Sequence, residues 1–153
     1  MLNQLFPQHV DNTYRGYKLA LWLFVLVLFM KLGMSMGSIF NGYSVASSAD
    51  GIPLATFSPG AAATVVSLFA LLGLSHFLFG LLGIVALVRY RNMVPFVFAL
   101  FLLEYLGRRL ILQFLPIPRT GTSTGLYVNL ALLAVMIAGL ALSLRSPDNR
   151  VRA

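Results

Sequence analysis

The sequence contains no cysteine and only 4 acidic residues among 153. The lack of cysteine excludes disulfide bonds, thiolate metal sites, iron–sulfur clusters and thiol nucleophiles. The lack of acids leaves 11 lysines and arginines largely unbalanced, with a formal net charge of +7. Charged residues of both signs make up only 10% of the chain, against about 25% in a typical soluble domain. This shortage of charge is typical of a membrane protein.

Familiar catalytic and nucleotide-binding motifs are absent as well. The sequence has no HExxH, GxSxG, Walker or GxGxxG pattern. Its two histidines, His9 and His76, are too few for a four-histidine haem bundle. No basic patch alternates with aromatic residues as in a nucleic-acid site. We therefore expect no cofactor, no bound metal and no nucleic-acid partner, and the sequence favours a non-enzymatic protein without excluding an enzyme.

Hydrophobic residues are abundant, at 59% of the chain, and they gather in four long runs. The runs cover residues 19–40, 62–88, 94–115 and 126–144. A helix that crosses a bilayer needs roughly 20 mainly apolar residues, and the runs do not alternate as barrel strands do. The sequence thus predicts an all-α fold with a single domain over residues 1–153, an integral membrane four-helix transmembrane bundle. The first run is too long for the apolar region of a cleaved signal peptide.

Local residue types indicate where the predicted helices begin and end. Asp11–Thr13 offers side-chain oxygens that can cap the start of the first helix. Pro95 suits the first turn of the third helix, and Pro116 ends that helix because proline disfavours helix in the residue before it. Residues 41–60 contain glycine, serine and two prolines. We expect them to form an outer loop that covers the mouth of the bundle.

Positive charges predict how the chain is oriented. Seven lysines and arginines lie on one side of the four runs and only Arg119 lies on the other. Because basic connections stay in the cytoplasm, we expect both termini to be cytoplasmic, with the chain in the inner membrane of a bacterium. The seven residues are Arg15, Lys18, Arg89, Arg91, Arg145, Arg150 and Arg152.

Five polar residues interrupt the apolar runs: Lys31, His76, Glu104, Arg108 and Asn129. A helix rises about 1.5 Å per residue, which places all five roughly 14–24 Å from the cytoplasmic ends of their helices. They therefore share one layer in the outer half of the membrane. Ionisable groups at that depth are costly and commonly mark functional sites. We expect these five residues to line a ligand-binding site.

A purely structural role is open for each residue of the layer. Glu104 and Arg108 are four residues apart on one helix face and suit an ion pair. Lys31 can extend to the headgroups or pair with Glu104. His76 suits either a hydrogen-bonded packing role or proton handling. Asn129 suits an interhelical hydrogen bond.

Small residues predict close helix contacts. Gly73, Gly80 and Gly83 share the helix face that carries the histidine of the second run. Gly33 and Gly37 form a GxxxG pair in the first run. Such positions allow two helix backbones to approach closely, either within one chain or between two copies.

The balance of charge in the layer points to a ligand. Lys31, Arg108 and Arg109 face a single acid, Glu104, so ionised side chains leave an excess of two positive charges. Such an excess is expensive in a low-dielectric zone unless an anion or water compensates it. We therefore expect a pocket that holds an anionic or carbonyl-bearing molecule.

Three functions follow from this layer. The leading hypothesis is a small multi-pass membrane protein that binds or transports a small amphipathic or anionic molecule. The first alternative is an accessory or assembly subunit, whose partner is a membrane complex or a second copy of the chain. The second alternative is an intramembrane enzyme that uses Glu104 or His76 as acid or base.

Overall fold

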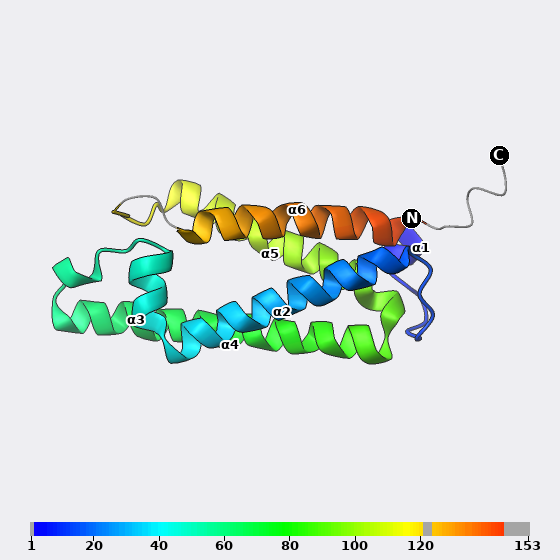
Figure 1. Ribbon diagram of the computed structural model, residues 1–153, viewed down its shortest axis with the longest axis horizontal. Coiled ribbons are helices and arrows are strands. Elements are labelled where there is room, and N and C mark those ends of the chain that lie inside the picture. Colours follow the sequence, from blue (N-terminus) through cyan, green and yellow to red (C-terminus); the bar gives the residue numbers. More distant parts are fainter. Residues whose placement is uncertain (1, 121–123, 146–153) are drawn as a thin grey trace.

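The computed structural model describes residues 2–120 and 124–145, and it is helical throughout, with no strand in these ranges (Figure 1). Four long helices lie close to the predicted runs: α2 Lys18–Phe40, α4 Pro59–Arg89, α5 Val94–Phe114 and α6 Thr124–Leu144. The other elements are short: α1 Leu2–Leu5, α3 Gly42–Ser44, the π-helix η1 Val45–Ala49, and the 3-10 helices η2 Leu54–Thr56 and η3 Arg91–Met93.

Three of the helices in the described residues are long and apolar enough to cross a membrane. These are α2, α4 and the part of α6 from Gly125 to Leu144. The helix α5 is not among them, and it carries three ionisable residues, Glu104, Arg108 and Arg109. By their length and composition, these three helices therefore indicate a membrane protein.

The helix ends follow from local chemistry, with one correction. Ser58 caps α4 by accepting a hydrogen bond from the Ala61 amide at 3.3 Å. Pro95 lies in the first turn of α5, as predicted. The predicted cap at Asp11–Thr13 is wrong, because α2 begins later, after Tyr17, which makes no side-chain cap. The Asp11 carboxylate instead accepts from the Thr13 amide at 2.8 Å and closes a local turn.

The four long helices run side by side along the molecule (Figure 1). The helix α2 packs along both α4 and α6, and α5 packs mainly on α6. The short helix η3 joins α4 to α5, so these two helices meet at that end. The N-terminal residues, η3 and the last turn of α6 all lie at the same end of the molecule (Figure 1).

Aromatic side chains fill the core between α2 and α5. The rings of Phe24 and Phe98 are edge to face, with centroids 4.8 Å apart, and the Phe101 ring stacks on Phe24 at 6.1 Å. All three rings are fully buried, or nearly so. By contrast, Trp22 and Phe29 on α2 are 72% and 75% exposed, which is typical of a surface that faces lipid.

Residues 41–58 are more ordered than the predicted loop. They form the short helices α3, η1 and η2, and they pack against α4. Ile52 and Leu54 are buried there against Val65, Val66 and Phe69. The long α4 therefore supports this segment with its first turns, and the role of the segment as a lid stays a prediction.

Gly73 is the point where α4 approaches α2 most tightly at backbone level. A Cβ at this position would lie 2.9 Å from Ser38 Cβ and 3.0 Å from the Ser35 carbonyl oxygen. We expect Gly73→Ala to push the helices apart and lower the free energy of unfolding by about 1–2 kcal/mol, measured in detergent. Gly33→Ala is the matched control, since nothing lies within 4 Å of a Cβ there. Equal losses in the two variants would contradict this packing.

Candidate functional site

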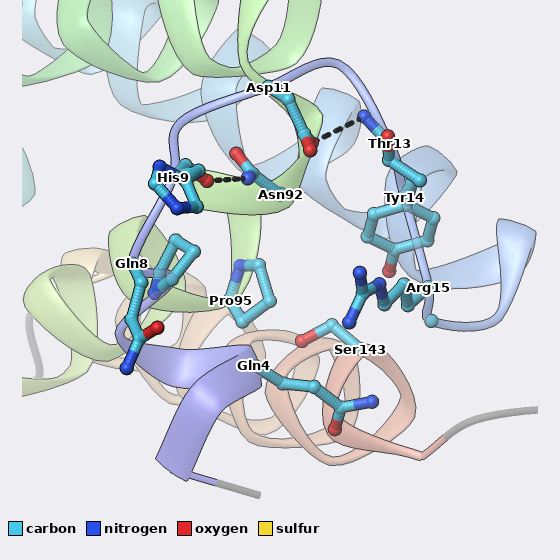
Figure 2. A pocket seen from close by; sticks show the side chains of 12 residues that line it. Gln4, Gln8, His9, Asp11, Thr13, Tyr14, Arg15, Asn92, Pro95 and Ser143 are labelled. Carbon is cyan, nitrogen blue, oxygen red and sulfur yellow. Dashed lines mark hydrogen bonds between the residues drawn. The ribbon is translucent and has the colours of Figure 1, made fainter.

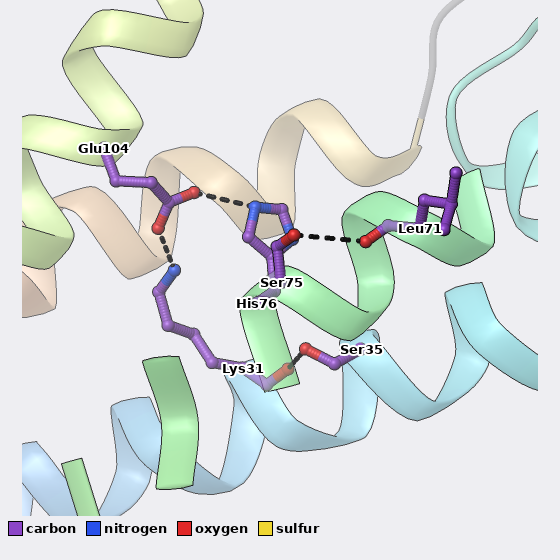
Figure 3. Close-up of polar contacts among 6 residues, drawn as sticks. All are labelled: Lys31, Ser35, Leu71, Ser75, His76 and Glu104. Atoms are coloured by element: carbon purple, nitrogen blue, oxygen red, sulfur yellow. Dashed lines mark hydrogen bonds and ion pairs between the residues drawn. The ribbon is translucent and has the colours of Figure 1, made fainter. Parts of the chain in front are cut away.

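Three of the predicted residues meet at one carboxylate. Lys31 from α2, His76 from α4 and Glu104 from α5 form what we call the Glu104 cluster (Figure 3). The Lys31 ammonium donates to Glu104 Oε2 in an ion pair. His76 Nε2 lies 3.0 Å from Glu104 Oε1. One carboxylate thus joins three helices.

The helix contacts explain this geometry. The tight approach at Gly73 brings α4 against α2, so His76 and Lys31 reach the same space. The Ser35 hydroxyl donates to the Lys31 carbonyl at 2.7 Å, within α2. The Lys31 ammonium also lies 4.7 Å from the centroid of the Phe101 ring, in a cation–π contact.

The Glu104 cluster pairs one cation with one anion and is partly open. Lys31 and Glu104 cancel one another. A carboxylate only accepts hydrogen bonds, so the contact to His76 places a hydrogen on Nε2. The side chains of His76 and Glu104 each keep 25% of their exposure, and Lys31 keeps 13%. The three side chains are therefore partly accessible from outside the cluster.

The structure does not bring the other two predicted residues into the cluster. Within the described residues, no ion pair joins Arg108 to Glu104, whose oxygens face α2 and α4 instead. Arg108 and Arg109 are exposed on α5, and Asn129 is half-buried on α6. A part in ligand binding for Arg108 and Asn129 stays a prediction.

An apolar groove between α4 and α5, which we call the α4–α5 groove, lies next to the cluster. Its volume is about 210 Å³. Phe79, Leu82 and Ala86 of α4 face Val97 and Phe101 of α5 across it, and Val10 and Tyr90 close one end. Phe101 belongs to both features, because its ring also contacts the Lys31 ammonium. A polar cluster and an apolar groove are therefore adjacent.

The surroundings of the cluster limit its chemistry. The Ser75 hydroxyl donates to the Leu71 carbonyl at 3.2 Å, so it is turned to its own helix rather than to the neighbouring His76 (Figure 3). In the part of the chain that the structure describes, no three His, Cys, Asp or Glu side chains could hold a metal ion together. The arrangement is suited to hydrogen bonding and ion pairing with a polar group.

Comparison of the chain with protein-family models, with curated proteins and with solved structures gives no match.

Proposed function

We propose that the chain is a four-span transmembrane bundle that binds or moves a small amphipathic molecule. In this arrangement α5 crosses the membrane in addition to α2, α4 and α6. Its Glu104 is costly in a membrane by itself, but the ion pair with Lys31 of α2 removes most of that cost. The distribution of lysine and arginine supports placing both termini in the cytoplasm, in a bacterial inner membrane.

The position of Phe101 supports an amphipathic ligand in particular. This one side chain borders the Glu104 cluster and also lines the α4–α5 groove. A molecule with its polar head at the cluster can therefore lay its apolar part along the groove. Ligand pockets commonly combine an apolar lining with a few polar groups that fix orientation.

The donors of the cluster indicate the class of the polar head. The Lys31 ammonium has three N–H groups, and only one of them is needed for the bond to Glu104, so two are left for the head. An anionic or carbonyl-bearing head can share these donors with Glu104. Arg108 lies one helical turn beyond Glu104 and supplies a second cation for an anionic head.

Native mass spectrometry of the protein, gently extracted from its own membrane, tests this function. We expect the wild type to carry a small molecule of defined mass. The double variant Lys31→Met with Glu104→Gln should lose it, because the head loses its partners. Val97→Trp should also lose it, because the new ring fills the α4–α5 groove. Arg119→Gln, in the connection that follows α5, is the control and should retain the molecule.

Two outcomes would contradict the proposal. The same extra mass in all variants would place the molecule elsewhere. A wild type that carries a second polypeptide in fixed stoichiometry, and no small molecule, would favour the accessory-subunit hypothesis instead.

A further inference from the structure

A second cavity lies at the end of the molecule that carries the N-terminal residues (Figure 1), and Figure 2 shows it from close by. Its volume is about 240 Å³. Three parts of the chain enclose it: the N-terminal segment from Gln4 to Gly16, the α4–α5 turn with Asn92, and the last turn of α6 with Ser143. We call it the N-terminal pocket.

Specific contacts hold the N-terminal segment over this pocket. The Asn92 side-chain amide donates to the His9 carbonyl at 2.7 Å, and the Tyr17 amide donates to the Leu142 carbonyl at 3.2 Å. Gly16 presses against α6 so closely that a Cβ would lie 2.6 Å from the Ser143 carbonyl oxygen. These contacts therefore fix the N-terminal segment in place as one wall of the pocket.

Two residues that line this pocket each have a buried polar atom that makes no hydrogen bond with the described residues. The two atoms are the Tyr14 hydroxyl and Asn92 Oδ1. Buried polar atoms in native proteins nearly always have a partner. The volume is many times the about 10–15 Å³ that a single water needs, so the space admits a small polar group.

These two atoms need different hydrogen-bonding partners. Asn92 Oδ1 only accepts, so its partner must carry an N–H or O–H. Burial raises the pKa of Tyr14 to about 12, so its hydroxyl stays protonated at neutral pH and can donate to an acceptor. One molecule satisfies both atoms only if it has a donor and an acceptor.

Charged residues of the pocket indicate which chemical groups its ligand should carry. Figure 2 draws Arg15 and Ser143 on one side of the pocket and Asp11 with Asn92 on the other. A guanidinium binds phosphate well through paired hydrogen bonds. Asp11 uses one oxygen for the Thr13 amide, which leaves the other free to accept from an amine. The two sides thus suit a phosphate and a donor group.

We propose that the N-terminal pocket binds a phosphate ester that also bears an amine, with the phosphate at Arg15 and Tyr14 and the amine at Asn92 and Asp11. This chemistry belongs to phospholipid headgroups and to soluble phosphate esters alike. The site is independent of the amphipathic ligand proposed above. Its occupant ties the N-terminal segment to the α4–α5 turn.

Binding to the full-length protein in detergent tests this site. The soluble probes are O-phosphoethanolamine and phosphocholine, which differ in that only the first has N–H donors. The lipid probes are dihexanoyl phosphatidylethanolamine and dihexanoyl phosphatidylcholine. We expect the ethanolamine compound of a pair to raise the thermal midpoint and to bind at least tenfold more tightly than the choline compound. A response to both ethanolamine probes indicates a soluble ester, and a response to the lipid alone indicates a headgroup.

Variants of the pocket decide whether this binding is specific. Arg15→Gln and Tyr14→Phe should each weaken ethanolamine binding about tenfold, and Tyr14→Phe removes only a hydroxyl and so preserves the fold. Arg119→Gln and Tyr43→Phe, which lie away from the pocket, are the matched controls. Equal binding of the ethanolamine and choline probes, no binding of any probe, or wild-type binding by Tyr14→Phe and Arg15→Gln would each overturn the proposal.

Discussion

Replacing Glu104 with glutamine is expected to destabilise the protein by about 3 kcal/mol, because it leaves the Lys31 ammonium without its counter-charge among apolar helices. Glutamine keeps the size of the side chain and an oxygen that can accept from His76. The loss therefore reports mainly on charge. Reversible unfolding in detergent measures it, with Arg109→Gln on the same helix as the control, since Arg109 is exposed.

A second substitution should reverse most of this effect. In the double variant Lys31→Met with Glu104→Gln, no charge remains unpaired, and apolar replacements of buried ion pairs are commonly neutral. We expect its stability to lie within about 1 kcal/mol of the wild type. If the loss in the double variant equals the sum of the losses in Glu104→Gln and in Lys31→Met alone, the ion pair between α2 and α5 is refuted.

Truncating Phe98 to alanine should have a comparably large effect. The ring is fully buried, contacts Phe24 edge to face, and lies so close to Gly139 that a Cβ there would overlap it. Lipid is as apolar as the core, so burial from water contributes little to helix packing, and the loss comes from the cavity. We expect about 3 kcal/mol, measured by the same unfolding experiment.

The matched control for Phe98 is Phe114→Ala, at the end of the same helix, where the ring is 77% exposed. This variant should change stability by less than about 0.5 kcal/mol. Gly139→Leu should recover part of the loss in Phe98→Ala, because its side chain points into the new cavity. Equal effects of the two phenylalanine variants would contradict the core between α5 and α6.

Much of the helical fold could be predicted from hydropathy alone. Continuous apolar runs set the bounds of α2, α4, α5 and α6 to within a few residues. The depth of Lys31, His76 and Glu104 followed from counting residues along each helix, since the rise per residue is fixed. That count placed the three side chains in one layer before their contacts were known.

The partners within the layer could not be predicted in the same way. Spacing along α5 suited Arg108 as the partner of Glu104, and Lys31 was the other possible partner. The carboxylate pairs with Lys31 and also contacts His76, both on other helices. That choice depends on how each helix is rotated about its axis, which a single sequence does not fix. The α4–α5 groove could not be predicted either, because it depends on the spacing between α4 and α5.

Residues 41–58 and the N-terminal segment were missed for a different reason. The first was treated as a loop because it contains glycine, serine and two prolines, and in the second only a helix cap was predicted, at Asp11–Thr13. Their structure comes from contacts with distant parts of the chain, such as Ile52 on α4 and His9 on Asn92. Local propensity carries little information about such contacts.

Photocrosslinking in native membranes tests the central claim most directly. A benzophenone amino acid at Phe79 lies in the α4–α5 groove, and the same group at Phe29 lies on the exposed face of α2. We predict that the adduct at Phe79 has one defined mass and that the adducts at Phe29 are the mixed lipids of the bilayer. The same lipid mixture at both positions would contradict a specific amphipathic ligand at the Glu104 cluster.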